Sequence, residues 1–192
     1  MKKIILASSS PRRKEILNRF DLKFDIICSN IEEYVDKNDD PIKTVMSLAF
    51  EKCQDVANRC NEGDIIIAAD TIVYKDYILG KPQNREEALN MIKHLSGDTH
   101  LVITGVSIIE VGNSRKIVDY EVTRVKFKDL TKDKIERYLD TEEYKDKAGA
   151  YGIQGYGEVL VESIEGSYSN VVGLPIAKLE ELLDKNYNIQ LL

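Results

Sequence analysis

The chain has 192 residues, of which 43% are hydrophobic and 31% charged, as is typical of one globular domain with its own core. Its net charge of −6 argues against a general nucleic-acid-binding protein, because such proteins present a basic face. No apolar run approaches the roughly 18 residues of a membrane-spanning helix, and the N-terminal residues lead into a helix-start signal rather than a cleavage site. We therefore expect a cytoplasmic protein with neither a nucleic acid nor a membrane as partner.

Strand and helix patterns alternate along the chain. Apolar alternation and short apolar runs predict strands at residues 2–7, 23–29, 62–74, 100–111, 116–127 and 158–166. Helical spacing and start signals predict helices at residues 11–20, 41–59, 86–95, 132–140 and 175–185. A Gly112-Asn113 turn predicts a hairpin, and a turn with a short strand is expected over 74–82. This order predicts an α/β fold with a mixed sheet and flanking helices, in which residues 1–192 form one domain.

The segment LASSSPRRKEIL combines a helix start with an unexpected charge. Ser10 and Pro11 are typical of the N-cap and the first position of a helix. The first turn then carries Arg12, Arg13 and Lys14, although a helix N-terminus is the positive end of the dipole and favours acids. An anion bound beside these three cations would explain them.

A strand, a serine-rich turn and a helix N-terminus together form a common type of anion site. Ser8 offers a hydroxyl group, and the planar guanidinium groups of Arg12 and Arg13 match phosphate oxygens. The chain contains neither a P-loop motif nor a Rossmann fingerprint. We expect the anion to be a polyphosphate, and the spacing leaves open whether Arg13 binds it or supports the helix.

Two ionisable residues interrupt apolar patterns. Asp70 follows IIIAA and precedes TIVY, and a carboxylate inside a buried strand is costly without a cation, a metal or a catalytic task. Lys52 shares the apolar stripe of helix 41–59 with Val45 and Val56. The alternatives are an aspartate that merely ends the strand and a lysine that snorkels from the edge of the stripe.

Three further features are weaker when each is taken alone. Lys81 lies in a GKP turn, where a solvated lysine would look the same. Glu32 and Glu33 open an acidic loop and could ligate Mg²⁺, although a solvated pair is the commoner case. Gln154 lies among the glycines of GAYGIQGYG, and its amide suits the edge of a nucleobase, whereas a flexible turn would need no ligand.

Seven segments, in order along nearly the whole chain, resemble the Maf family. They are LASSSPRRKEIL, IEE, AADTIV, GKP, LSGDTH, DKAGAYGIQG and NVVGLP, of which the first and the sixth are highly specific. The resemblance implies an elongated, two-lobed fold with a central cleft, similar to that of the inosine triphosphate pyrophosphatases. It also implies hydrolysis of a nucleoside triphosphate to the monophosphate and pyrophosphate, with Mg²⁺ or Mn²⁺ as the divalent cofactor.

The resemblance also implies roles for individual residues. Asp70 would accept a proton from the attacking water and, with Glu33, would place the metal. The phosphates would be held by Ser8, Arg12, Lys52 and Lys81, to which the helix start adds Arg13. Arg12, Thr71 and Gln154 match the dTTP/UTP type rather than the group that takes 7-methyl-GTP. The implied role is removal of non-canonical or excess pyrimidine nucleotides.

A rival interpretation comes from a different class of protein: a nucleotide-binding regulatory module that acts in cell division without turnover. Asp70 argues against it, because a buried carboxylate is costly in a protein that only binds. A phosphatase or nucleotidyl transferase with the same anion site is a further alternative. The sequence also leaves a homodimer open.

Overall fold

One mixed, seven-stranded sheet organises the computed structural model, which describes residues 3–192. The strands are β1 Ile4–Leu6, β2 Asp25–Ile26, β3 Ile65–Lys75, β4 Tyr77–Leu79, β5 Thr99–Glu110, β6 Lys116–Phe127 and β7 Val161–Glu165. Their order is β2-β1-β3-β5-β6-β7, with β4 paired to β3. β1 is parallel to β2 and β3, whereas the other pairs are antiparallel. The predicted α/β class with a mixed sheet is therefore confirmed.

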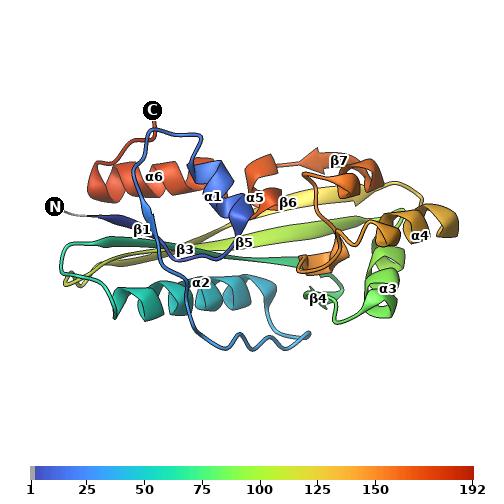
Figure 1. Ribbon diagram of the computed structural model, residues 1–192, viewed down its shortest axis with the longest axis horizontal. Coiled ribbons are helices and arrows are strands. Elements are labelled where there is room, and N and C mark those ends of the chain that lie inside the picture. The colour runs from blue at the N-terminus through green and yellow to red at the C-terminus, as the bar shows by residue number, and fades with distance from the viewer. Residues whose placement is uncertain (1–2) are drawn as a thin grey trace.

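Helices cover both faces of this sheet. They are α1 Pro11–Leu17, α2 Pro41–Ala57, α3 Arg85–Leu95, α4 Lys132–Asp140, α5 Tyr168–Val172 and α6 Ile176–Tyr187, with short 3-10 helices η1 Ala148–Ala150 and η2 Tyr156–Leu160. Figure 1 shows an elongated molecule with α1, α5 and α6 on one face, α2 on the other, and α3 and α4 at the end remote from the termini. Among residues 3–192, no helix has the length and apolar character needed to cross a membrane.

Strand β3 forms the centre of the core because both of its faces are covered. Ile65, Ile67 and Ala69 pack in the cluster that includes α1 and α6. Ile66 and Ala68 point the other way and pack against α2. This alternation is the two-residue period of a strand, and it explains why the segment shows a continuous apolar run. The division into two lobes and the assignment of 1–192 as one domain stay predictions.

The predicted elements all have counterparts, and the differences lie mainly at their ends. The helix predicted over 11–20 ends at Leu17, and the strand predicted over 23–29 shortens to Asp25–Ile26. The strand predicted over 158–166 starts only at Val161, since η2 occupies the residues before it. Residue 2 of the first predicted strand lies outside the described part of the chain. Helix α5 was not predicted, because five residues are too few to display helical periodicity.

The starts of α3 and α1 are capped in different ways. Asn84 Oδ1 accepts the Glu87 N–H at 2.9 Å, as expected of a capping box. In a standard capping box the Glu87 carboxylate would accept the N–H of the N-cap residue, Asn84. Here it accepts the N–H of the preceding residue, Gln83, at 2.8 Å. Ser10 does occupy the N-cap of α1, but its side chain makes no capping hydrogen bond.

Strand β5 approaches the backbone of α2 closely at Gly105. A Cβ atom there would overlap the Val45 carbonyl and lie 2.9 Å from the Met46 nitrogen. The absent side chain therefore lets α2 rest directly on the sheet. This close approach places the inward face of α2, which includes Lys52, against β3.

The Gly105→Ala variant should be destabilised by about 3 kcal/mol, because the added methyl group must displace helix backbone rather than a flexible side chain. Urea unfolding of the variant and the wild type measures the difference. Gly80→Ala is the matched control, since a Cβ at Gly80 would meet nothing within 4 Å. Equal unfolding midpoints for the two variants would contradict this account of the contact between α2 and β5.

Candidate active site

A cavity of about 980 Å³ opens where β3, α1, α2 and the glycine-rich segment 149–157 meet. Charged side chains of both signs line it: the basic residues Arg12, Arg13, Lys52, Lys81, Lys145 and Lys147, and the acidic residues Glu33, Asp70, Glu143 and Asp146. Nearly all residues singled out from the sequence therefore come together in one place. The cations gather here although the chain as a whole is acidic, with a net charge of −6.

The ammonium group of Lys52 lies between two carboxylates. It donates to Asp70 Oδ1 and forms an ion pair with Glu33 Oε1 at 2.7 Å. Lys52 and Asp70 are only 9% and 7% exposed, so the prediction that both lie inside apolar elements is confirmed. Burial raises the pKa of Glu33, but the hydrogen bond and charge of Lys52, with Lys81 and Arg13, outweigh it and hold this pKa below the usual value.

The donor set of this cluster fits a divalent cation. Glu33 and Asp70 each use one oxygen on Lys52, which leaves the other carboxylate oxygen of each for a ligand. In the described residues, no group of three or more His, Cys, Asp or Glu side chains could hold a metal ion. Mg²⁺ is commonly bound by one or two carboxylates together with waters and substrate phosphates, so two carboxylates suffice if the substrate supplies the remaining oxygens.

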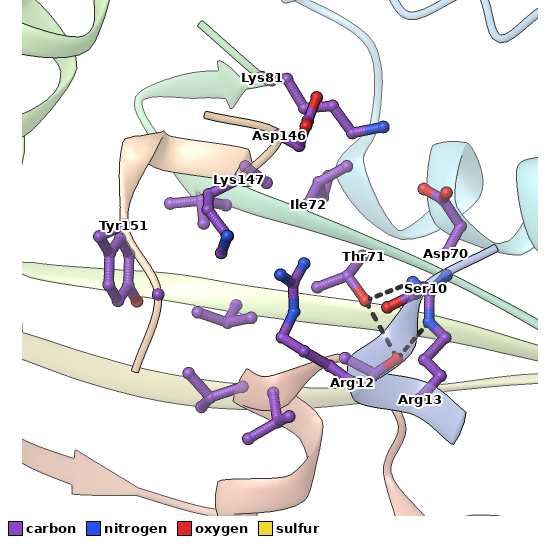
Figure 2. A pocket seen from close by; sticks show the side chains of 18 of the residues that line it. Ser10, Arg12, Arg13, Asp70, Thr71, Ile72, Lys81, Asp146, Lys147 and Tyr151 are labelled. Atoms are coloured by element: carbon purple, nitrogen blue, oxygen red, sulfur yellow. Dashed lines mark hydrogen bonds between the residues drawn. The ribbon is translucent and has the colours of Figure 1, made fainter. Parts of the chain in front are cut away.

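The guanidinium group of Arg13 donates three hydrogen bonds to other parts of the protein. Its Nε donates to the Gly173 carbonyl at 2.7 Å, Nη2 to Thr71 Oγ1 at 3.1 Å and Nη1 to Ser8 Oγ at 3.4 Å. One of the dashed lines in Figure 2 marks the hydrogen bond between Arg13 and Thr71. Between the two alternatives that the sequence left open, these contacts favour support of the helix, since Arg13 ties α1 to β3 and to the end of α5.

Arg12 and Lys147 direct their charged ends into the same part of the cavity (Figure 2). Burial lowers the pKa of Arg12. Burial also lowers the pKa of Lys147, and the nearby charge of Arg12 adds to this shift. Glu143 and Asp146 oppose both shifts through their negative charge. An anion between the two cations would relieve their mutual repulsion.

Ser8 lies apart from the main cavity. It lines a smaller neighbouring cavity of about 60 Å³ with Ser29, Arg13 and Lys52 among others. Its hydroxyl oxygen accepts the N–H of Ser10 at 3.2 Å as well as that of Arg13 Nη1. Ser8 therefore shapes the turn before α1, and its predicted contact with phosphate stays a prediction.

Of the three residues predicted to set the choice of base, Arg12, Thr71 and Gln154, the last two differ in how they are held. Thr71 Oγ1 lies 2.9 Å from Thr104 Oγ1 and accepts from Arg13, so its position is fixed from two sides. Gln154 is exposed and lines the cavity from the glycine-rich segment. The Gln154 side chain can therefore contact a ligand, but its position depends on the backbone of the glycine-rich segment.

Several residues of the site were missed from the sequence. Lys147 and Glu143 lie in or next to the DKAGAYGIQG segment, but a charged residue in a glycine-rich stretch looks like a solvated loop. Thr104 and Asn170 are completely buried and form part of the support behind Thr71, where the Thr104 hydroxyl donates to the Asn170 carbonyl at 3.2 Å. Thr104 could have been identified from the sequence, because it is a polar residue within the apolar run of β5.

His100 supports Tyr151, whose ring lines the cavity. His100 Nε2 lies 2.8 Å from the Tyr151 hydroxyl, and both rings pack edge to face with Phe127. Burial, with a smaller effect of the charge on Lys75, lowers the pKa of His100 to about 3. The imidazole is therefore neutral in the folded protein at neutral pH.

Acid should destabilise the protein through His100. The unfolded chain takes up this proton near pH 6.5, while the folded chain resists it until about pH 3, so stability falls as the pH drops through this range. Between about pH 7 and 5, this residue should cost the wild type about 2 kcal/mol of unfolding free energy. Urea unfolding at both pH values should show a correspondingly smaller loss for His100→Gln. An equal loss in both proteins would refute the assignment of a neutral, buried imidazole.

Comparisons with known proteins relate the chain to one family and to named enzymes. A model of the family described as Maf-like protein matches residues 3–186. A protein of Alkaliphilus metalliredigens named dTTP/UTP pyrophosphatase is 52% identical over 192 residues, covering 100% of both chains. One of the same name from Clostridioides difficile is 53% identical and covers 98% of this chain and 97% of its own. Among solved structures, the Ham1 protein of Staphylococcus aureus aligns over 83% of this chain and 80% of its own, with 14% identity and a TM-score of 0.49, a likeness too slight to carry an argument.

Proposed function

The chain belongs to the Maf-like protein family, and we propose that it is a nucleoside triphosphate pyrophosphatase that hydrolyses dTTP and UTP to the monophosphate and pyrophosphate. The observation that carries this proposal is the buried carboxylate of Asp70, held by Lys52 in a cavity lined with cations. Relatives about half identical over their full length bear the name dTTP/UTP pyrophosphatase, which supports the choice of substrate. The expected cytoplasmic location and a homodimer stay predictions.

In the proposed reaction, the protein neutralises phosphate charge and positions a water. The water attacks a phosphorus of the α–β bridge, the bond from that phosphorus to the bridging oxygen breaks, and Asp70 takes the proton. Arg12 and Lys81 would hold phosphate oxygens, as the family resemblance implies. Lys147 points into the same cavity and would be a third cation near the phosphates. Lys52 would fix the Asp70 carboxylate through their ion pair and add positive charge beside the phosphates.

Glu33 and Asp70 would hold the divalent cation of this reaction, through the carboxylate oxygens that Lys52 leaves available. A bound Mg²⁺ or Mn²⁺ would neutralise charge that develops on the phosphate oxygens. The protein's own contribution here is the alignment of the Asp70 and Glu33 carboxylates by the ammonium group of Lys52. The removal of excess or modified pyrimidine nucleotides is the proposed cellular role.

Product analysis tests the proposed function directly. In each reaction the purified protein and Mg²⁺ or Mn²⁺ are incubated with one nucleotide: dTTP, UTP, CTP, GTP, ITP or 7-methyl-GTP. The products are then separated by chromatography. We expect monophosphate and pyrophosphate, formed fastest from dTTP and UTP. Inorganic phosphate in place of pyrophosphate would indicate a phosphatase. Binding without turnover of any nucleotide would favour the regulatory module instead.

The Asp70→Asn variant should lose about 10³-fold in kcat, because an amide keeps the side-chain volume but cannot accept the proton. Steady-state hydrolysis of dTTP measures this loss, and urea unfolding shows whether the variant still folds. Asp98→Asn is the matched control, since Asp98 pairs with Lys75 at 2.8 Å on an exposed surface away from the cavity. Activity close to that of the wild type in Asp70→Asn would refute the role of Asp70 as proton acceptor.

Replacing Gln154 by alanine should alter the choice of base more than the rate of hydrolysis. The amide of Gln154 offers an acceptor and two donors to a base edge, and it lines the same cavity as Asp70 but comes from a different segment of the chain. We expect the ratio of kcat/KM for UTP over CTP to fall about tenfold, while kcat for UTP changes by less than about threefold. An unchanged ratio would argue against base recognition by Gln154.

A further inference from the structure

Glu143 has no role in the reaction proposed above, although its side chain lines the cavity. Its Oε2 accepts the backbone N–H of Tyr156 at 2.7 Å, and its Oε1 accepts that of Gly157 at 3.0 Å. One carboxylate thus holds two consecutive backbone donors of a loop 13 and 14 residues further along the chain. Hydrogen bonds to an ionised acceptor are about twice as strong as neutral ones.

The glycines around Gln154 make room for this carboxylate. A Cβ at Gly155 would overlap Glu143 Oε2, and one at Gly152 would lie 3.2 Å from Oε1. At Gly157, a Cβ would lie 2.5 Å from the Gly152 carbonyl oxygen, so the loop also closes tightly on itself. These contacts show that segment 152–157 is packed around the Glu143 side chain, and they explain its glycines without appeal to flexibility.

The other end of Glu143 is fixed to the core. It lies three residues beyond α4, where the Glu143 N–H donates to Thr141 Oγ1 at 3.3 Å. Helix α4 is anchored by the buried ring of Tyr138, whose hydroxyl donates to the Ala150 carbonyl at 3.2 Å. The carboxylate therefore connects the exposed Gln154 loop to a rigid helix.

We propose that Glu143 is a positioning residue for substrate specificity: it fixes segment 152–157 and thereby directs the Gln154 amide at the base. This inference rests on the proposed function, in which Gln154 reads the base. The physical reason is that Gln154 is exposed, so the position of its amide depends on the backbone that Glu143 holds. Glu143 then acts on base choice through Gln154, without being a catalytic residue.

The Glu143→Gln variant tests this role with little change in volume. Its side chain has one acceptor oxygen instead of two, and its amide N–H₂ would face a backbone N–H, so at least one of the two loop contacts is lost. We expect the kcat/KM ratio for UTP over CTP to fall about tenfold, as is reasonable for the loss of one charge-assisted hydrogen bond. Faster hydrogen exchange at the Tyr156 and Gly157 amides should accompany this fall.

Glu142→Gln is the matched control, because the neighbouring Glu142 pairs with Lys145 at 2.8 Å on the exposed surface and should leave the ratio unchanged. The double variant Glu143→Gln with Gln154→Ala should show no further fall in the ratio beyond Gln154→Ala alone. If Gln154→Ala lowers the ratio but Glu143→Gln does not, the inference fails and the proposed role of Gln154 survives. If Gln154→Ala leaves the ratio unchanged, or if the two losses simply add, Glu143 does not act through Gln154 and the inference is overturned.

Discussion

The position of the Lys52 ammonium group between Asp70 and Glu33 is the constraint on which the rest of the site depends. Lys52 comes from the inward face of α2, Asp70 from the middle of β3 and Glu33 from the loop between β2 and α2. The three charges can meet only if α2 rests directly on the sheet, which Gly105 permits. Buried ion pairs contribute little net stability compared with apolar packing, so this arrangement is better explained by chemistry than by folding.

Elsewhere in the cavity wall, two of the side chains proposed to meet substrate are positioned through residues at other places in the sequence. Thr71 is fixed by Arg13 and Thr104, and the loop that bears Gln154 is fixed by Glu143. Precise sites need such support, because a side chain held only by its own rotamer preferences moves too freely to discriminate between ligands. The DKAGAYGIQG segment is therefore part of a packed wall, although its composition is that of a flexible turn.

The sequence predicted the parts of this site that break a regular pattern. Asp70 and Lys52 could be identified because each places a charge where the strand or helix period demands an apolar residue. Arg13, Glu143 and Asn170 could not be assigned in this way, since each depends on a partner that lies between 13 and 160 residues away, and no local pattern in the sequence indicates that contact. The fold shows the same limit: long periodic elements were correctly predicted, whereas the five-residue α5 and the shortening of β2 to two residues depend on tertiary packing.

The three adjacent cations in the first turn of α1 have different roles in the folded protein, although they look alike in the sequence. The three cations at the positive end of the helix raised the expectation of an anion, and in the folded protein they have different surroundings. Arg13 uses its N–H groups on Gly173, Thr71 and Ser8, while Lys14 is exposed to solvent. Arg12 directs its charged end into the part of the cavity that Lys147 also faces, and its charge lowers the pKa of Lys147 further. In the folded protein, the expectation of a bound anion rests on Arg12 and on Lys147, a residue 135 positions later in the chain, and not on the three adjacent cations that first suggested it.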